Sequence, residues 1–104
     1  MTLNDFQDKA AEFIVPTSTA NERVFGLLAE SGEVAGVFQR MFRGDYPPDE
    51  MGPKLIKELG DCLWYIAGIA RDNGWTLQDV AQVNIDKLES RKLRNLLVGK
   101  GDER

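Results

Sequence analysis

The sequence predicts an all-α protein built from four helices. Apolar residues recur at helical spacing along nearly the whole chain, glycine and proline cluster where each pattern stops, and no segment alternates as a strand would. With 104 residues, 42% of them apolar and 29% charged, the chain is sized for one domain. We expect a four-helix, bundle-like domain over residues 1–98 and a flexible tail over residues 99–104.

The first two predicted helices are separated by a short proline-containing segment. A first apolar stripe covers residues 3–14 and ends before Pro16. The second helix should begin near Asn21, a favourable N-cap residue. It should end before residues 44–48, because two adjacent prolines cannot lie inside a helix. Its predicted core face comprises Val24, Leu27, Leu28, Val34, Ala35, Phe38 and Phe42.

The third and fourth predicted helices have clear boundary signals. The third begins within residues 49–53 and stops at Gly74, a typical residue just beyond a helix end. Thr76, with Asp79 three residues later, resembles a capping box that opens a fourth helix running to about Leu97. The predicted core face of the third helix comprises Leu55, Leu59, Cys62, Leu63, Ile66, Ile69 and Ala70.

Composition excludes several classes of protein. The net charge of −4 argues against a general nucleic-acid binder, which normally carries a basic surface. No apolar stretch is long enough for a membrane span, and the first ten residues lack the apolar run of a secretory signal. The single cysteine, Cys62, cannot form an internal disulfide. We therefore expect a cytoplasmic protein without a nucleic-acid or membrane partner.

The chain contains no histidine. This absence removes the usual neutral metal ligand and the usual general base near pH 7. Any catalysis must therefore use carboxylates, lysine or a metal-bound water. Cys62 lies in a core stripe with no histidine to activate it, so we expect it to be inert.

Two pairs of acidic residues have the spacing of a possible metal site. Glu30 and Glu33 lie on the second predicted helix, and Glu58 and Asp61 lie on the third. The i, i+3 spacing places both carboxylates of a pair on one helix face, beside the apolar stripe. Like charges at that position repel one another and lose hydration, unless a cation lies between them. Either pair alone is also consistent with an ordinary solvated helix surface.

The turn between the two helices brings the pairs level. Both pairs lie roughly 14–20 Å along their helices from the turn, so an antiparallel hairpin places them side by side. An all-oxygen cluster suits Mg²⁺ or Mn²⁺, and the lack of histidine and of a second cysteine disfavours Zn²⁺. Gly32 and Gly60 lie inside the pairs. Close helix approach or ligand access would explain these glycines, and so would chance.

The fourth predicted helix carries a basic face. Asn84, Lys87 and Arg91 follow i, i+3, i+7 spacing and are suited to hold phosphate oxygens. The alternative interpretation is a basic helix end that is favoured by the helix dipole.

Two aromatic residues follow the second acidic pair. Tyr65 shares the face of Asp61, where it can contact a ligand or pack at the edge of the core. Trp64 projects to the other side of the helix, which favours a subunit interface.

Taken in order, these motifs resemble the MazG-like nucleoside triphosphate pyrophosphohydrolases of the all-α NTP pyrophosphatase superfamily. Their hallmark is a Glu-x-x-Glu pair followed at this kind of distance, here 24 intervening residues, by Glu-x-x-Asp. The resemblance covers nearly the whole chain apart from the first twenty residues. The motifs are Glu30-x-x-Glu33, Glu58-x-x-Asp61, Asn84-x-x-Lys87-Leu88-x-x-Arg91 and Gly99-x-Gly101-Asp102-x-Arg104.

The resemblance implies an oligomeric all-α hydrolase, a homodimer or homotetramer. The implied reaction converts an NTP or dNTP to the nucleoside monophosphate and pyrophosphate, in nucleotide-pool control or house-cleaning. The implied metal is Mg²⁺, with Mn²⁺ as an alternative. The implied ligands are Glu30, Glu33, Glu58 and Asp61, with Glu30 or Glu33 as the catalytic base; the implied nucleotide contacts are Tyr65, Asn84, Lys87 and Arg91.

The chain departs from the family pattern at three positions. Many relatives carry lysines where this chain has Gln39 and Arg40, and some carry another acid in place of Gly36. The sequence therefore leaves the number of bound metal ions open.

Two other functions conflict with the sequence, and a third remains open. A helical di-iron protein would use Glu-x-x-His motifs, which a chain without histidine cannot form. A DNA-binding helix over residues 76–91 conflicts with the isoelectric point of about 4.8. A non-catalytic helical dimerisation module, with Trp64 at the partner surface, remains the alternative.

Overall fold

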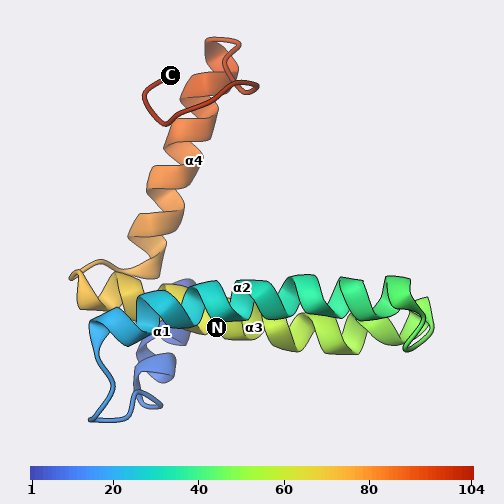
Figure 1. Ribbon diagram of the computed structural model, residues 1–104. Coiled ribbons are helices and arrows are strands. Elements are labelled where there is room, and N and C mark those ends of the chain that lie inside the picture. The colour runs from blue at the N-terminus through green and yellow to red at the C-terminus, as the bar shows by residue number, and fades with distance from the viewer.

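The computed structural model describes all 104 residues as helices and connecting segments, without a strand (Figure 1). The all-α, four-helix prediction is confirmed. None of the helices is both long and apolar enough to cross a membrane. The elements are α1 (Leu3–Ala11), α2 (Ala20–Arg43), the 3₁₀ turn η1 (Pro48–Glu50), α3 (Met51–Asp72) and α4 (Leu77–Leu93).

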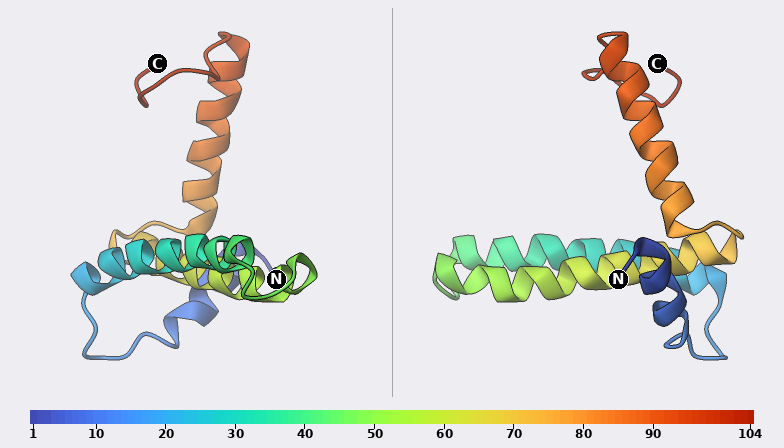
Figure 2. Two further views of the ribbon diagram at one scale, coloured as in Figure 1. Left: turned by 45° about the vertical axis from the view of Figure 1, so that its right-hand side comes forward. Right: turned by 180° about the vertical axis from the view of Figure 1, so that it is seen from behind.

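Helices α2 and α3 form a long antiparallel hairpin that is the body of the molecule (Figures 1 and 2). At the turn, Gly44 adopts a left-handed backbone with φ of 91°, a conformation that glycine reaches without a Cβ penalty. The Tyr46 hydroxyl donates to the Val37 carbonyl and holds the turn against α2. The segment with two prolines therefore forms the predicted hairpin connection.

Helix α1 packs across α3 and covers Trp64. The Trp64 indole N–H donates to the Ala10 carbonyl at 3.1 Å. The expectation that Trp64 marks a subunit interface is wrong for this reason: α1 occupies the side of α3 to which the indole points. The small core at this crossing comprises Ala10, Ala67, Ala70 and Leu77, with Phe6 and Trp64 packed against it.

One buried glutamine connects α1 to the start of α4. The Gln7 amide donates to the carbonyls of Ala67 at 3.2 Å and Trp75 at 3.0 Å, and its oxygen accepts from the Leu77 N–H at 3.1 Å. Asn4 accepts from the next backbone N–H of α4, also at 3.1 Å. Helix α1 thus satisfies N–H groups that have no partner within α4, and it connects the start of α4 to the hairpin.

Helix α4 projects away from the hairpin, and only its beginning contacts α1 and α3 (Figure 2). The radius of gyration is therefore 16.6 Å, whereas a compact chain of this length has about 13 Å. Only nine of the 104 residues are buried. Two packed helices cover only the sides that face each other, so Leu28, Phe42 and Leu59, which were predicted as core, are 71%, 81% and 50% exposed.

The structure shifts some predicted helix boundaries. Helix α2 begins at Ala20, and Thr19 rather than Asn21 is its N-cap. The capping box of Thr76 and Asp79 is present as predicted.

Helix α4 ends at Leu93, four residues before the predicted end. Asn95 adopts a left-handed backbone with φ of 58°, which stops the helix in the manner of a C-terminal glycine.

Candidate metal centre

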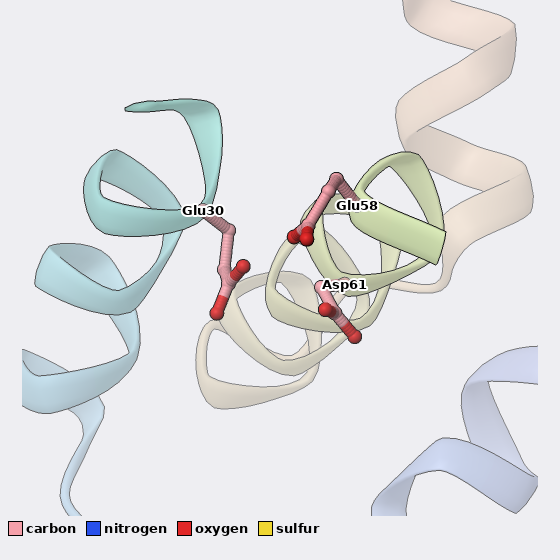
Figure 3. A group of neighbouring side chains, drawn as sticks. All are labelled: Glu30, Glu58 and Asp61. Atoms are coloured by element: carbon pink, nitrogen blue, oxygen red, sulfur yellow. The ribbon is translucent and has the colours of Figure 1, made fainter. Parts of the chain in front are cut away.

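Three of the four predicted metal ligands meet across the hairpin. Glu30 of α2 reaches towards Glu58 and Asp61 of α3 (Figure 3). One carboxylate oxygen from each of the three residues lies within 4.8 Å of the others. Equal distances from the turn place the pairs level, and antiparallel packing of α2 on α3 closes the remaining gap.

The three carboxylates have no basic partner in this chain. All five ion pairs of the structure involve other acidic groups. The pKa of Glu30 is raised, first by desolvation, then by the charges of Asp61 and Glu58 and by a hydrogen bond with Glu58. A cation between these oxygens would relieve that repulsion. The donor set of three carboxylates fits a hard divalent cation that prefers oxygen ligands.

Glu33 lies outside the group of three. It is exposed on α2, one turn after Glu30, and its charge makes the smallest contribution to the raised pKa of Glu30. The role of Glu33 as ligand or base stays a prediction.

The glycines that allow close packing are not those singled out in the sequence. A Cβ atom added at Gly32 or Gly60 would meet nothing within 4 Å, so the idea of close helix approach there is wrong for this chain. A Cβ at Gly26 would instead overlap the Tyr65 ring, and one at Gly68 would crowd the Arg23 side chain. Both positions are visible in the sequence only as unfavourable glycines inside a helix.

Tyr65, four residues after Asp61 on α3, lines a pocket. Its ring packs edge-on against Trp64, with ring centroids 5.0 Å apart and an interplanar angle of 87°. The pocket has a volume of about 170 Å³. Its lining combines Phe13, Val15 and Ser18 before α2, Glu22 and Arg23 of α2, and Trp64 and Tyr65 of α3. Sequence reasoning missed the residues before α2, because their approach to α3 depends on tertiary packing.

An ion pair, which we call the clamp, joins α2 to α3 at the end of the hairpin opposite the Gly44 turn. The Arg23 guanidinium donates to both Asp72 oxygens, at 2.6 and 2.7 Å, and to the Ser18 hydroxyl at 2.8 Å. The hydrogen bonds from Arg23 lower the pKa of Asp72, and burial opposes this effect. The clamp joins the first turn of α2 to the last turn of α3 and so supports the register that brings Glu30 to Glu58.

The basic face of α4 does not reach the carboxylates of its own chain. Asn84 is exposed, and α4 carries it away from the hairpin (Figure 1). Lys87 and Arg91 both donate to the Asp102 carboxylate, at 3.0 and 3.1 Å. The structure therefore gathers the acidic residues and holds the predicted nucleotide contacts of α4 apart from them.

Comparison with known proteins supplies a family assignment. Residues 19–94 match the family model described as the MazG nucleotide pyrophosphohydrolase domain. Over 81 residues the chain is 38% identical to a protein of Mycobacterium phage L5 called Gene 37 protein, an alignment that covers 76% of this chain and 71% of the relative. No solved structure matches the chain.

Proposed function

Because this chain belongs to the MazG nucleotide pyrophosphohydrolase family, we propose that it hydrolyses an NTP or dNTP to the nucleoside monophosphate and pyrophosphate with Mg²⁺. The observation that carries this proposal is the group formed by Glu30, Glu58 and Asp61, whose oxygens converge without a basic partner. A role in nucleotide-pool control or house-cleaning follows from this activity.

Glu30, Glu58 and Asp61 are the proposed ligands of Mg²⁺, with Mn²⁺ as an alternative. When bound, the ion neutralises charge on the triphosphate and polarises the phosphorus that is attacked. Glu33 is one helical turn from Glu30 and can join the ligands by rotating its side chain. Because it lies outside the group of three, Glu33 is also free to orient and deprotonate the attacking water.

The proposed reaction breaks the bond between the α phosphorus and the oxygen that bridges the α and β phosphates. The oxygen of a water molecule forms a bond to the α phosphorus, and pyrophosphate leaves with the bridging oxygen. Glu33 or Glu30 accepts the proton of the water, as a general base within hydrogen-bond reach can do. The monophosphate keeps the nucleophile's oxygen, so the atoms balance with one water consumed.

The pocket beside Tyr65 is the proposed location of the nucleobase. Tyr65 is four residues, or about one helical turn, from Asp61. A base in the pocket therefore leaves the α phosphate close to the carboxylates, and aromatic rings favour stacking with a flat base.

The contacts from α4 are proposed to come from a second copy of the chain. Asn84 and Lys87 cannot reach the acidic group while α4 points away from its own hairpin, and the nearly buried Arg91 side chain is held by Gly101 and Asp102. Apolar side chains remain exposed on the hairpin and on α4, and a second copy would cover them. We therefore propose a homodimer, or a homotetramer built from such dimers, in which the basic face of one chain meets the acidic group of another.

The first experiment measures pyrophosphate release from a panel of NTPs and dNTPs, with Mg²⁺ and with a chelator. The proposal expects turnover of at least one nucleotide that disappears on chelation and returns with Mg²⁺. No turnover of any nucleotide would overturn it.

The alternative is a non-catalytic dimerisation module, which the exposed apolar faces also favour. Substituting Glu33→Gln or Asp61→Asn distinguishes the two. A dimerisation module keeps its association and has no wild-type activity to lose. The hydrolase keeps its association and loses Mg²⁺-dependent pyrophosphate release.

A further inference from the structure

The segment that follows α4 is folded back onto the end of that helix. The Arg104 guanidinium donates to the carbonyls of Leu96 at 2.9 Å and Leu97 at 3.2 Å, and Arg94 donates to the Arg104 carbonyl at 2.7 Å. Gly99 and Gly101 have φ of 146° and 83°, which lets the segment reverse direction. The last six residues, for which the sequence predicts a flexible tail, are therefore hydrogen-bonded to α4 and to the residues that follow it in the structure.

This folded segment delivers one carboxylate to the basic face of α4. Asp102 accepts from Lys87 at 3.0 Å and from Arg91 at 3.1 Å, and Arg91 also donates to the Gly101 carbonyl at 3.2 Å. The Arg91 side chain is only 6% exposed, whereas the Asp102 side chain is 79% exposed. Arg91 thus anchors the segment. Asp102 lies at the solvent-exposed surface beside Lys87, and we call this group of Lys87, Arg91 and Asp102 the rim.

We propose that Asp102 is a positioning residue, which holds Lys87 in the orientation needed to bind phosphate groups. This inference rests on the proposed function, because the phosphates would belong to the nucleotide substrate. Asp102 itself need not touch the substrate.

The charges and donors at this rim are suited to that role. Lys87 has three N–H donors, and Asp102 engages one of them, which leaves two for phosphate oxygens. Two cations and one anion leave one net positive charge, so the rim still attracts a polyphosphate. A free lysine loses considerable side-chain entropy when a ligand immobilises it, and a lysine that is already held loses less.

The ion pairs of Asp102 can be removed by substitution without unfolding the protein. An ion pair at an exposed carboxylate contributes little to stability. Asp102→Asn should therefore fold normally. Glu103→Gln removes the same charge from the neighbouring residue, for which the structure has no hydrogen bond, and it is the matched control.

The experiment measures the affinity of each variant for Mg²⁺-pyrophosphate by calorimetry, and kcat and KM for the nucleotide that the wild type hydrolyses best. Asp102→Asn should weaken pyrophosphate binding and raise KM by about five- to tenfold. The change in kcat should be smaller. Glu103→Gln should match the wild type, and Asp102→Glu should recover much of the lost affinity, which a merely structural role would not require.

Each outcome decides between the two proposals. If Asp102→Asn binds pyrophosphate like Glu103→Gln, the positioning role is overturned while the hydrolase activity stands. Tighter binding by Asp102→Asn also overturns it, because Asp102 would then compete with the phosphates. If the wild type hydrolyses no nucleotide but Asp102→Asn still weakens pyrophosphate binding, the proposed function fails and the positioning role stands. A wild type that neither binds pyrophosphate nor hydrolyses a nucleotide overturns both.

Discussion

The α2–α3 hairpin and helix α4, which we call the arm, differ in how many contacts each makes within its own chain. The hairpin is closed by a tight turn at one end and by the Arg23–Asp72 pair at the other, and it gathers three carboxylates. The arm is held only at its beginning, by α1 and the end of α3, and the rest of it has no neighbouring helix (Figure 2). One chain therefore brings together the acidic residues of the proposed site. The basic residues of α4 in the same chain lie away from those carboxylates.

This difference separates two kinds of residue in the proposed site. Residues of the hairpin act in the geometry that a single chain provides. The position of the arm residues in the proposed site depends on a second copy of the chain, on the folded C-terminal segment with Asp102, or on the bound substrate. Variants of the two regions should therefore behave differently, and the following predictions test that contrast.

The largest effect is expected for Glu58→Gln in the hairpin. Loss of one carboxylate from the group of three should reduce Mg²⁺-dependent pyrophosphate release by about 100-fold or more, with the helical fold unchanged. The measurement is pyrophosphate release alongside circular dichroism. Glu50→Gln, an exposed acid near the start of the same helix, should retain wild-type activity. Equal activity of both variants would contradict the metal centre.

Mixing two inactive variants tests whether Lys87 of one chain acts at the carboxylates of another chain. If Lys87 serves the carboxylates of a partner, coexpressed Glu58→Gln and Lys87→Ala chains should form mixed dimers with one intact site. A random mixture should then recover about a quarter of wild-type activity. Glu58→Gln coexpressed with Asp61→Asn should recover none, since both lesions lie in the hairpin. No recovery in the first mixture would place Lys87 and the carboxylates in the same chain.

Removal of the clamp should destabilise the hairpin. Asp72→Asn weakens the charged hydrogen bonds from Arg23 and should lower the free energy of unfolding by about 2–3 kcal/mol, as measured by urea denaturation. The folded-state pKa of Asp72 is lowered, so its contribution is complete above the unfolded pKa near 4. The contribution is lost as the pH falls through the lower folded value. Asp8→Asn, at an exposed carboxylate without an ion pair or side-chain hydrogen bond, is the control and should leave this acid dependence unchanged.

Two glycines of α2 should respond in opposite directions to alanine. Gly26→Ala forces the Tyr65 ring aside and should cost about 1–3 kcal/mol of stability. Gly32→Ala enters open space and should stabilise the helix by up to about 1 kcal/mol. Thermal unfolding of both variants measures the difference. Destabilisation by Gly32→Ala would indicate that a second copy packs on that face of the hairpin.

The smallest effect is expected at Glu30 in the metal-free protein. Its pKa is raised in the folded state, so the fold binds this proton more tightly than the unfolded chain does. Stability should therefore increase as the pH falls through the folded pKa, and Mg²⁺ affinity should decrease over the same range. Glu30→Gln should abolish the trend in stability without lowering the unfolding midpoint. A lower midpoint in the metal-free variant would contradict the repulsion described for this group.

Local features of the sequence were sufficient for much of the fold and for the acidic half of the candidate site. The rise per residue and the position of the turn placed Glu30 level with Glu58, because both quantities depend only on the chain between them. The Thr76 capping box and the Gly44 turn are equally local. The covered position of Trp64 and the crowding of Gly26 by Tyr65 were missed, since both depend on how helices cross.

The sequence by itself determined four helices, their order, and two acidic pairs at equal distances from a hairpin turn, because helical periodicity and turn chemistry are properties of neighbouring residues. Tertiary structure alone decided that Glu33 stays outside the group formed by Glu30, Glu58 and Asp61, and that Gln7 of α1 is hydrogen-bonded to the start of α4. It also decided that Asp102 returns to Lys87. These arrangements depend on packing and hydrogen bonds between residues far apart in the chain, which periodicity does not specify.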